Sequence, residues 1–206
     1  MADLYLVRHG QTKLNEENKI RGWKDVPLDA QGKEEAQQLA TYFQDHDVVL
    51  VITSDLSRAT ETADTIAEEH NLPVKDDKHW RPWDLGEWSG EDAESIVDDM
   101  LACVDNDGKC PPGGEVFSRF RERVQQGLDD AMRYAARAQG ECVIVVTHVR
   151  CVRMVLDLLE GDESLTYIKQ EADPVDPGGI VQVTEDGAWE IVEHGMAAPR
   201  QGRTIS

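Results

Sequence analysis

Three short, nearly continuous apolar segments constrain the fold of this chain more than any other feature. They cover residues 3–7, 48–53 and 141–147, and their β-branched and aliphatic side chains are typical of buried strands. Amphipathic segments with helical spacing, such as about 33–44 and 115–138, lie between them. Strands that alternate with helices usually pair in parallel. The sequence therefore predicts an α/β fold, a three-layer α/β/α sandwich with a mostly parallel central sheet.

The 206 residues are expected to form one domain over residues 1–196, with an insertion at about 91–114 and a disordered tail at 197–206. A polar loop over 11–31 is expected first, and later a helix with Arg58 in its first turn and a short strand at 72–74. A tryptophan-rich loop over 79–88 is expected to pack on the core. A helix after His148 to about Leu159 and a hairpin of 180–183 and 189–192 around Asp186-Gly187 complete the prediction.

The chain is strongly acidic, with 41 acidic and 21 basic residues and a formal net charge of −20. Such a charge repels nucleic acid and anionic membranes, so neither is an expected partner. It also repels phosphorylated ligands, so an anion site requires a local cluster of arginines. No apolar stretch approaches the roughly 20 residues of a membrane span, and no signal region precedes the first strand. We expect a cytoplasmic protein, either a monomer or a homodimer.

The four cysteines, Cys103, Cys110, Cys142 and Cys151, have no CxxC spacing. This argues against a zinc site and favours reduced thiols that fill small spaces. A Cys103–Cys110 bridge stays open at this point. No metal or cofactor is expected.

Each of the three apolar segments is followed by a cationic or imidazole side chain. Arg8 and His9 follow the first, Arg58 the second and His148 the third. Because ligands bind outside the carboxyl ends of parallel strands, these four side chains are expected to converge. Two guanidiniums bind a phosphoryl group well, and an imidazole is able to attack it. Taken singly, each residue is better explained as a surface arginine or a helix-capping histidine, whereas four of them at three strand ends are not.

Several motifs now make a resemblance clear. They are Leu-Val-Arg-His-Gly-Gln-Thr over 6–12 with Asn15, Arg-Gly-Trp-Lys-Asp-Val-Pro-Leu over 21–28 with Gly32, Ser-Asp-Leu-Ser-Arg-Ala over 54–59, Leu-Gly-Glu-Trp-Ser-Gly over 85–90, Pro-Gly-Gly-Glu over 112–115 and Val-Thr-His over 146–148. In this order and over about residues 2–195 they resemble the histidine phosphatase superfamily, in its phosphoglycerate-mutase-like branch.

The resemblance implies that His9 is the phosphorylated nucleophile. It also implies that Arg8, Arg58 and His148 form the phosphate pocket and that Asn15 adds a hydrogen bond. Arg21 and Gly22 match positions that contact the non-phosphate part of the substrate in mutase-like members. An arginine at position 21 indicates either a substrate with a further negative charge or a solvated side chain.

The chain departs from the family pattern at the proton donor. Family members usually carry a glutamate where this chain has Pro82. Asp84 is the predicted replacement acid, because its apolar neighbours would raise its pKa, and Glu87 is the second choice. Alternatively, Asp84 caps the turn or pairs with Arg81. Without an acid, the enzyme should prefer good leaving groups.

A second departure follows His148, where Val149-Arg150 replaces the usual glycine. Arg150 either turns into the pocket as a third cation or points to solvent, whereas Arg153 is expected to pair within the fold. Arg119, Arg121 and Arg123 are interpreted as a solvated helix face.

Together these features predict a metal-independent phosphatase that hydrolyses a phosphorylated small molecule through a phosphohistidine on His9. Two alternatives stay open. One is phosphoryl transfer of the phosphoglycerate mutase type, and the other is a non-catalytic module that binds a phosphorylated ligand.

Overall fold

The structure, a computed structural model, describes residues 3–106, 108–138, 140–161, 165, 168, 173–184 and 188–192. The predicted tail at 197–206 and the turn at Asp186-Gly187 lie outside these residues. Six strands are described: β1 (Asp3–Arg8), β2 (Val48–Thr53), β3 (Val74–Asp76), β4 (Cys142–Thr147), β5 (Ile180–Val183) and β6 (Trp189–Val192). The helices are α1 (Lys13–Glu16), α2 (Ala30–Phe43), α3 (Ser57–His70), α4 (Ala93–Asp105), α5 (Phe117–Ala135) and α6 (Val149–Glu160), with short 3-10 turns η1 (Lys78–Trp80) and η2 (Gly86–Trp88).

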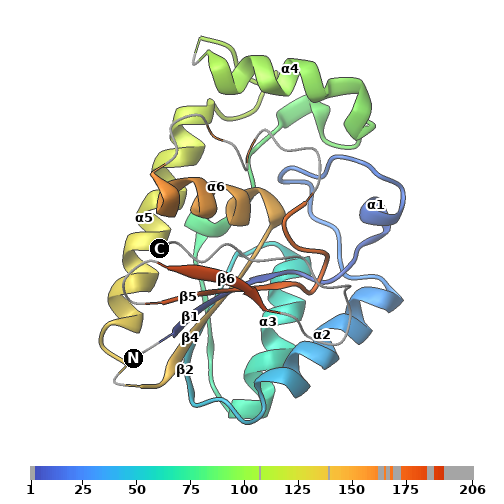
Figure 1. Ribbon diagram of the computed structural model, residues 1–206. Coiled ribbons are helices and arrows are strands. Elements are labelled where there is room, and N and C mark those ends of the chain that lie inside the picture. The colour runs from blue at the N-terminus through green and yellow to red at the C-terminus, as the bar shows by residue number, and fades with distance from the viewer. Residues whose placement is uncertain are drawn as a thin grey trace.

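The strands form one sheet in the order β3-β2-β4-β1-β5-β6 (Figure 1). The first four strands are parallel, and β5 and β6 add an antiparallel hairpin beside β1. The predicted mostly parallel sheet and the hairpin are therefore confirmed. This order places β2, β4 and β1 side by side, so the carboxyl ends of the three predicted strands are neighbours.

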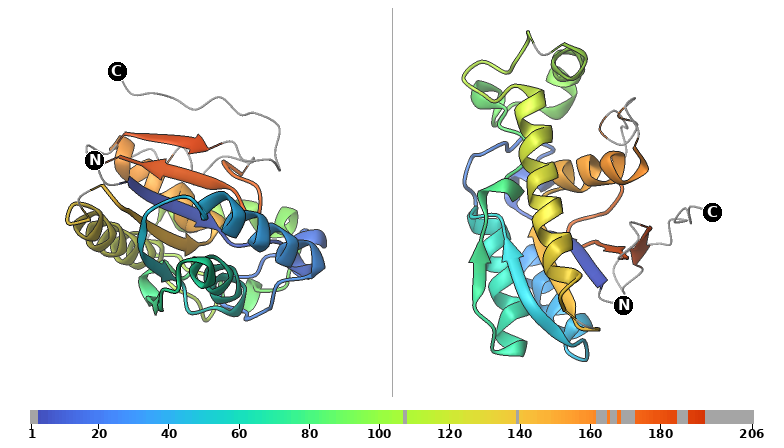
Figure 2. Two further views of the ribbon diagram at one scale, coloured as in Figure 1. Left: turned by 90° about the horizontal axis from the view of Figure 1, so that it is seen from below. Right: turned by 90° about the vertical axis from the view of Figure 1, so that its left-hand side faces the viewer.

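Helices cover both faces of this sheet (Figure 2). Leu4 and Leu6 of β1 point to the core that α5 and α6 cover, whereas Tyr5 and Val7 point to the core beneath α2 and α3. Because both faces are buried, the strands carry apolar residues at successive positions instead of alternating with polar ones. The three-layer α/β/α sandwich is confirmed.

Helix α4 lies beyond the sheet, at the top of Figure 1 and of the right-hand view in Figure 2. Its Ile96, Met100 and Cys103 pack against the larger core, while Val97 is 43% exposed. One face of α4 is thus anchored and a neighbouring apolar residue stays accessible. No helix in the described residues is both long and apolar enough to cross a membrane.

The second helix begins three residues earlier than predicted, at Ala30 instead of 33. Asp29 is its N-cap, and Asp29 Oδ1 accepts a hydrogen bond from Gly32 N at 2.8 Å. Gly32 therefore lies in the first helical turn and does not precede the helix. A Cβ on Gly32 would lie 2.1 Å from Gln11 O, and one on Gly10 would lie 2.4 Å from Gly32 O. This close approach fixes the loop that follows His9.

The tryptophan-rich loop is held by Arg123, contrary to the prediction that this arginine belongs to a solvated face. Arg123 donates to the carbonyls of His79, Arg81 and Pro82 and pairs with the carboxylate of Glu115. Both charged side chains are at least 85% buried. Basic and acidic residues alternate along α5, as is typical of a solvent-exposed helix face. Arg123 nevertheless points inward, where its guanidinium donates to the loop carbonyls.

Candidate active site

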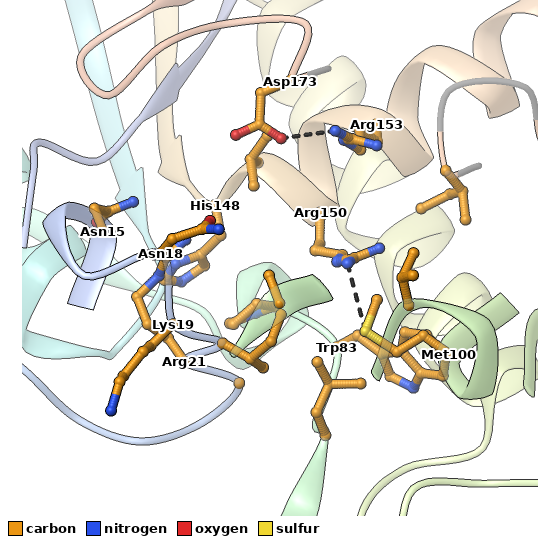
Figure 3. Close-up of a pocket in the computed structure, with 18 of the residues that line it drawn as sticks. Asn15, Asn18, Lys19, Arg21, Trp83, Met100, His148, Arg150, Arg153 and Asp173 are labelled. Carbon is orange, nitrogen blue, oxygen red and sulfur yellow. Dashed lines mark hydrogen bonds and ion pairs between the residues drawn. The ribbon is translucent and has the colours of Figure 1, made fainter. Parts of the chain in front are cut away.

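The predicted residues meet in one cavity of about 920 Å³ at the carboxyl ends of β1 and β4 (Figure 3). Arg8, His9, Arg58 and His148 all line it, and each is at most 3% exposed. His9 N donates to Thr147 O at 2.9 Å, which joins the two strand ends directly. The convergence expected from the three strand ends is therefore observed.

The His9 imidazole has a defined proton position. Its Nδ1 lies 2.6 Å from Gly10 O, and because a carbonyl only accepts hydrogen bonds, Nδ1 must carry the proton. Burial, followed by the positive charges of Arg58, Arg21 and Arg8, holds the pKa of His9 well below 6.5. His9 is thus neutral at pH 7, and its Nε2 keeps a free lone pair.

His148 has the opposite tautomer. Arg58 Nε donates to His148 Nδ1 at 3.3 Å, so the proton is on Nε2, which lies 2.9 Å from Ser54 Oγ. Burial and the charge of Arg58 keep its pKa well below 6.5 too. The rings of His9 and His148 are 5.0 Å apart between centroids. One imidazole therefore offers a lone pair, and its neighbour offers an N–H.

Arg58 is fixed by backbone carbonyls. Its Nη1 donates to Lys24 O and its Nη2 to Gly22 O, both at 3.0 Å. With the bond to His148, three of the five N–H groups of the guanidinium are engaged, and two remain for a ligand. Burial lowers the pKa of Arg58 to about 10, so it stays cationic at pH 7.

Arg8 is held by two residues that lie far from it in the sequence, Asp173 and Val175. Its Nη1 donates to Asp173 Oδ2 at 2.7 Å and to Val175 O at 2.6 Å. Among the described residues, the buried Nε of Arg8 has no hydrogen-bond partner. A buried guanidinium donor without a partner is costly unless a ligand or water satisfies it. It is therefore a candidate donor to a bound anion.

Asn15, Arg21 and Gly22 also line the cavity. Asn15 Oδ1 accepts from Thr12 N and Thr12 Oγ1 at 3.1 and 2.8 Å, which orients the amide and leaves Nδ2 as the donor available to a ligand. Gly22 has a φ of +49°, and its carbonyl holds Arg58. Burial, and then the charges of Arg8 and Arg58, lower the pKa of Arg21 to about 9.

The two carboxylates predicted as proton donors lie apart from this cavity. Asp84 Oδ1 accepts a hydrogen bond from Gly86 N at 3.0 Å, which is the turn-capping arrangement weighed above. Arg81 pairs with Asp55 at 2.6 Å and not with Asp84. Pro82 lines the cavity, whereas Asp84 and Glu87 are not among its lining residues; in the described part of the chain, the lining carboxylates are Glu94, Asp98, Asp173 and Asp176.

Helix α6 positions two arginines, Arg150 and Arg153, at the cavity. Arg150 turns into the cavity, and its Nη2 lies 3.6 Å from Met100 Sδ. Arg153 Nη2 pairs with Asp173 Oδ1 at 2.7 Å, as expected of a residue that pairs within the fold. Figure 3 shows both contacts.

The cysteines are free thiols: Cys103, Cys142 and Cys151 are buried and Cys110 is exposed. The Cys103–Cys110 bridge is therefore not formed. Within the described residues, no group of three or more His, Cys, Asp or Glu side chains is placed to hold a metal ion.

Comparison with known proteins identifies the family. A profile of the histidine phosphatase superfamily (branch 1) matches residues 4–195. The chain belongs to the histidine phosphatase superfamily. This superfamily member is 30% identical over 154 residues to a protein named "Probable phosphoglycerate mutase" from Salmonella choleraesuis, with 72% of the chain and 70% of that protein covered.

Solved structures of the histidine phosphatase fold also match. A mycobacterial glucosyl-3-phosphoglycerate phosphatase superposes with a TM-score of 0.78 at 22% identity, covering 96% of this chain and 100% of the other. The α-ribazole phosphatase from Shigella flexneri gives a TM-score of 0.72 at 26% identity, covering 88% of this chain and 90% of the other. The phosphoglycerate-mutase-like character inferred from the motifs is thus confirmed.

Three residues of the site were missed as site residues by the sequence reasoning. Ser54 contacts His148, Thr62 Oγ1 accepts from Gly10 N at 3.2 Å, and Asp173 bridges Arg8 and Arg153. Ser54 belongs to the motif over 54–59 quoted above and Thr62 lies four residues after Arg58, so their proximity to Arg58 in the sequence is a usable signal. Asp173 is in a segment without a periodic pattern, and only the folded chain reveals its role.

Proposed function

We propose that this chain is a phosphatase that hydrolyses a phosphomonoester, or a related phospho-compound, through a phosphohistidine on His9. One observation carries the proposal: a buried, neutral His9 whose Nε2 is unprotonated lies beside His148 and two fixed guanidiniums. Phosphatases among the fold relatives, including a mycobacterial enzyme solved with VO3, support hydrolysis as the reaction.

In the proposed first step, the Nε2 lone pair of His9 attacks phosphorus and the bond to the ester oxygen breaks. The imidazole ring gains positive charge, which strengthens its Nδ1–H bond to Gly10 O. In the second step, water attacks the phosphohistidine, so that inorganic phosphate leaves and the His9 lone pair is restored.

The unused donors of Arg58 and the Nε of Arg8 would bind the phosphoryl oxygens, and the Nε2–H of His148 would join them by exchanging its contact with Ser54 Oγ for one with the substrate. The two guanidiniums are held in place before the substrate arrives, so they stabilise developing charge without reorganisation. Because two fixed guanidiniums supply the positive charge, we propose that the reaction requires no metal ion.

In the proposed reaction, the leaving oxygen has no proton donor at the position of the family's glutamate. Pro82 has no proton to donate, and the carboxylate of Asp84 caps a turn. We therefore propose that phosphate esters of good leaving groups react best. If Asp84 still acts as the acid, Asp84→Asn should reduce turnover of alkyl phosphates more than that of aryl phosphates, and Glu87→Gln serves as the comparison.

The test is hydrolysis of p-nitrophenyl phosphate in the presence of a chelator by the wild type and His9→Ala. Wild-type turnover with formation of an acid-labile, base-stable phosphoryl group on the chain, both absent in His9→Ala, would support the proposal. Equal turnover in both proteins would refute the role of His9. Loss of wild-type turnover in the chelator would refute metal independence.

A second candidate is phosphoryl transfer of the mutase type, which the name of the Salmonella relative favours. It uses the same residues, but the phosphoryl group returns to an acceptor hydroxyl. Incubation of 3-phosphoglycerate with the enzyme distinguishes the two, because a mutase conserves organic phosphate and a phosphatase releases it. Tight binding of phosphate esters without either reaction would indicate the non-catalytic module.

A further inference from the structure

The cavity contains more positive charge than one phosphate requires. Six cationic residues line it, namely Arg8, Lys19, Arg21, Arg58, Arg150 and Arg153. Arg8 and Arg58 flank His9, and Arg153 is paired with Asp173. Arg21 and Arg150 form no ion pair with any described residue. In a chain with a net charge of −20, two such guanidiniums in one cavity need an explanation.

Arg150 is the clearer of the two. It is only partly buried, and its one hydrogen-bond contact with the described residues is to the thioether of Met100, at 3.6 Å. A thioether sulfur is a weak acceptor, whereas a guanidinium has five donors and prefers oxyanions. Burial and the charge of Arg153 lower the pKa of Arg150 to about 10. It therefore remains cationic at pH 7 with most of its donors unused.

Arg21 connects this arginine to the phosphate pocket. Its charge lowers the pKa of His9, and the charge of Arg150 in turn lowers the pKa of Arg21. His9, Arg21 and Arg150 also line the same cavity, so the charge of Arg21 acts on both of the others. Like charges that face one cavity repel each other unless an anion lies between them.

The nearby carboxylates do not neutralise this pair. Asp173 lies close enough to raise the pKa of both arginines, but its two oxygens bind Arg8 and Arg153 at 2.7 Å each. Glu94, Asp98 and Asp176 are exposed to solvent, which screens their charges.

The rest of the cavity has room for an organic group. About 920 Å³ is far more than one phosphate fills and lies within the range of sites for drug-sized ligands. Helix α4 provides an apolar wall with Val97, Met100, Leu101 and Val104. The contact between Arg150 and Met100 in Figure 3 joins this wall to α6.

We propose that Arg150, together with Arg21, forms a second oxyanion subsite, so that the substrate is a phosphomonoester whose organic part carries a carboxylate or another oxyanion. This inference rests on the proposed function, because it places the reacting phosphate at His9. It makes Arg150, two positions after His148, a specificity-determining residue.

Matched aryl phosphates test the subsite. One pair compares 3- or 4-carboxyphenyl phosphate with the corresponding carbamoylphenyl phosphate. The other pair compares 3- or 4-sulfophenyl phosphate with the corresponding sulfamoylphenyl phosphate. Each pair has nearly the same shape and differs in one charge. The proteins are the wild type, Arg150→Gln and, as the control for loss of one positive charge, Arg119→Gln, whose side chain is exposed on α5 outside the cavity.

We expect the wild type to favour a charged member of a pair by about 10- to 100-fold in kcat/KM, as charge-assisted hydrogen bonds predict. Arg150→Gln should reduce this preference to below about threefold, whereas Arg119→Gln keeps it. The preferred pair tells whether a planar carboxylate or a tetrahedral oxyanion is bound. No preference in the wild type, or the same preference in Arg150→Gln, would overturn the proposal.

A binding measurement distinguishes failure of this inference from failure of the proposed function. The affinities of the same probes for His9→Ala and for His9→Ala/Arg150→Gln are measured by calorimetry, without any turnover. If the wild type hydrolyses no probe but the charged probes bind His9→Ala more tightly through Arg150, the phosphatase proposal fails and the subsite stands. If hydrolysis proceeds without charge preference, the subsite fails and the phosphatase stands.

Discussion

Arg58 Nε donates to His148 Nδ1 across 3.3 Å, and the same guanidinium donates to the carbonyls of Gly22 and Lys24. One side chain at the start of α3 thereby sets the tautomer of the second histidine and anchors the loop that carries Arg21. The geometry proposed for catalysis and the geometry of this loop depend on the same planar group.

Arg58→Lys should therefore disable the site although it keeps the charge. A lysine has a single nitrogen and does not reproduce the fork that binds His148, Gly22 and Lys24. We expect kcat/KM for an aryl phosphate to fall by at least about 100-fold, and the free energy of unfolding by about 1–3 kcal/mol from unpaired carbonyls. Kinetics and urea unfolding measure the two effects. Activity near the wild-type level would contradict the role given to Arg58.

Stability should decrease in mild acid because of His9 and His148. Their pKa values are held well below 6.5 in the folded chain, while an unfolded histidine titrates near 6.5. Below about pH 6.5 the unfolded chain binds more protons than the folded chain, so each histidine should remove up to about 1.4 kcal/mol per pH unit until its lowered pKa is reached. Urea unfolding at pH 7, 6 and 5, in phosphate-free buffer, measures this slope.

The control for this slope is His148→Gln, which removes one of the two groups. Its free energy of unfolding should depend less steeply on pH than that of the wild type. Parallel curves for the two proteins would mean that His148 does not stay neutral in the folded chain.

Gly22→Ala should impair both folding and catalysis. The new Cβ would lie 2.6 Å from Ser89 Oγ and 3.2 Å from Leu85 N, at a φ of +49°. We expect a loss of about 1–3 kcal/mol and reduced turnover, because the Gly22 carbonyl holds Arg58. Gly161→Ala has a similar φ of +63° with nothing within 4 Å of its Cβ, so it should cost about 1 kcal/mol and leave kcat unchanged. Equal effects of the two variants on kcat would contradict this explanation.

Arg123→Met should loosen the tryptophan-rich loop. It leaves the carboxylate of Glu115 and three loop carbonyls without their donor, so we expect a loss of about 3 kcal/mol or more in urea unfolding. Arg119→Met on the exposed side of the same helix should change stability by less than about 0.5 kcal/mol. If the two variants are equally stable, Arg123 belongs to a solvated face after all.

The sheet and the convergence of Arg8, His9, Arg58 and His148 could be predicted because short stretches of sequence indicate them. Apolar runs of strand length indicate the central sheet, and the histidine or arginine that follows each run indicates the edge of the sheet where ligands bind. The sequence predicts the start of α2 three residues too late, because Gly32 resembles a helix boundary and Asp29 is not marked as the N-cap. The predicted solvated position of Arg123 is wrong, because the sequence does not show which of three arginines on one helix faces the loop carbonyls. Asp173 has no sequence signal, because its partners are 165 and 20 residues away.

The ion pair between Arg8 and Asp173 has a consequence for protein synthesis. The ribosome makes β1 before Asp173, so Arg8 takes its position only when a carboxylate 165 residues later has been added, and β1 gains its antiparallel neighbour β5 later still. A nascent or truncated chain that ends before Asp173 contains His9, Arg58 and His148 but lacks the anchor of Arg8. The anchoring of Arg8 is therefore coupled to synthesis of the chain through residue 173.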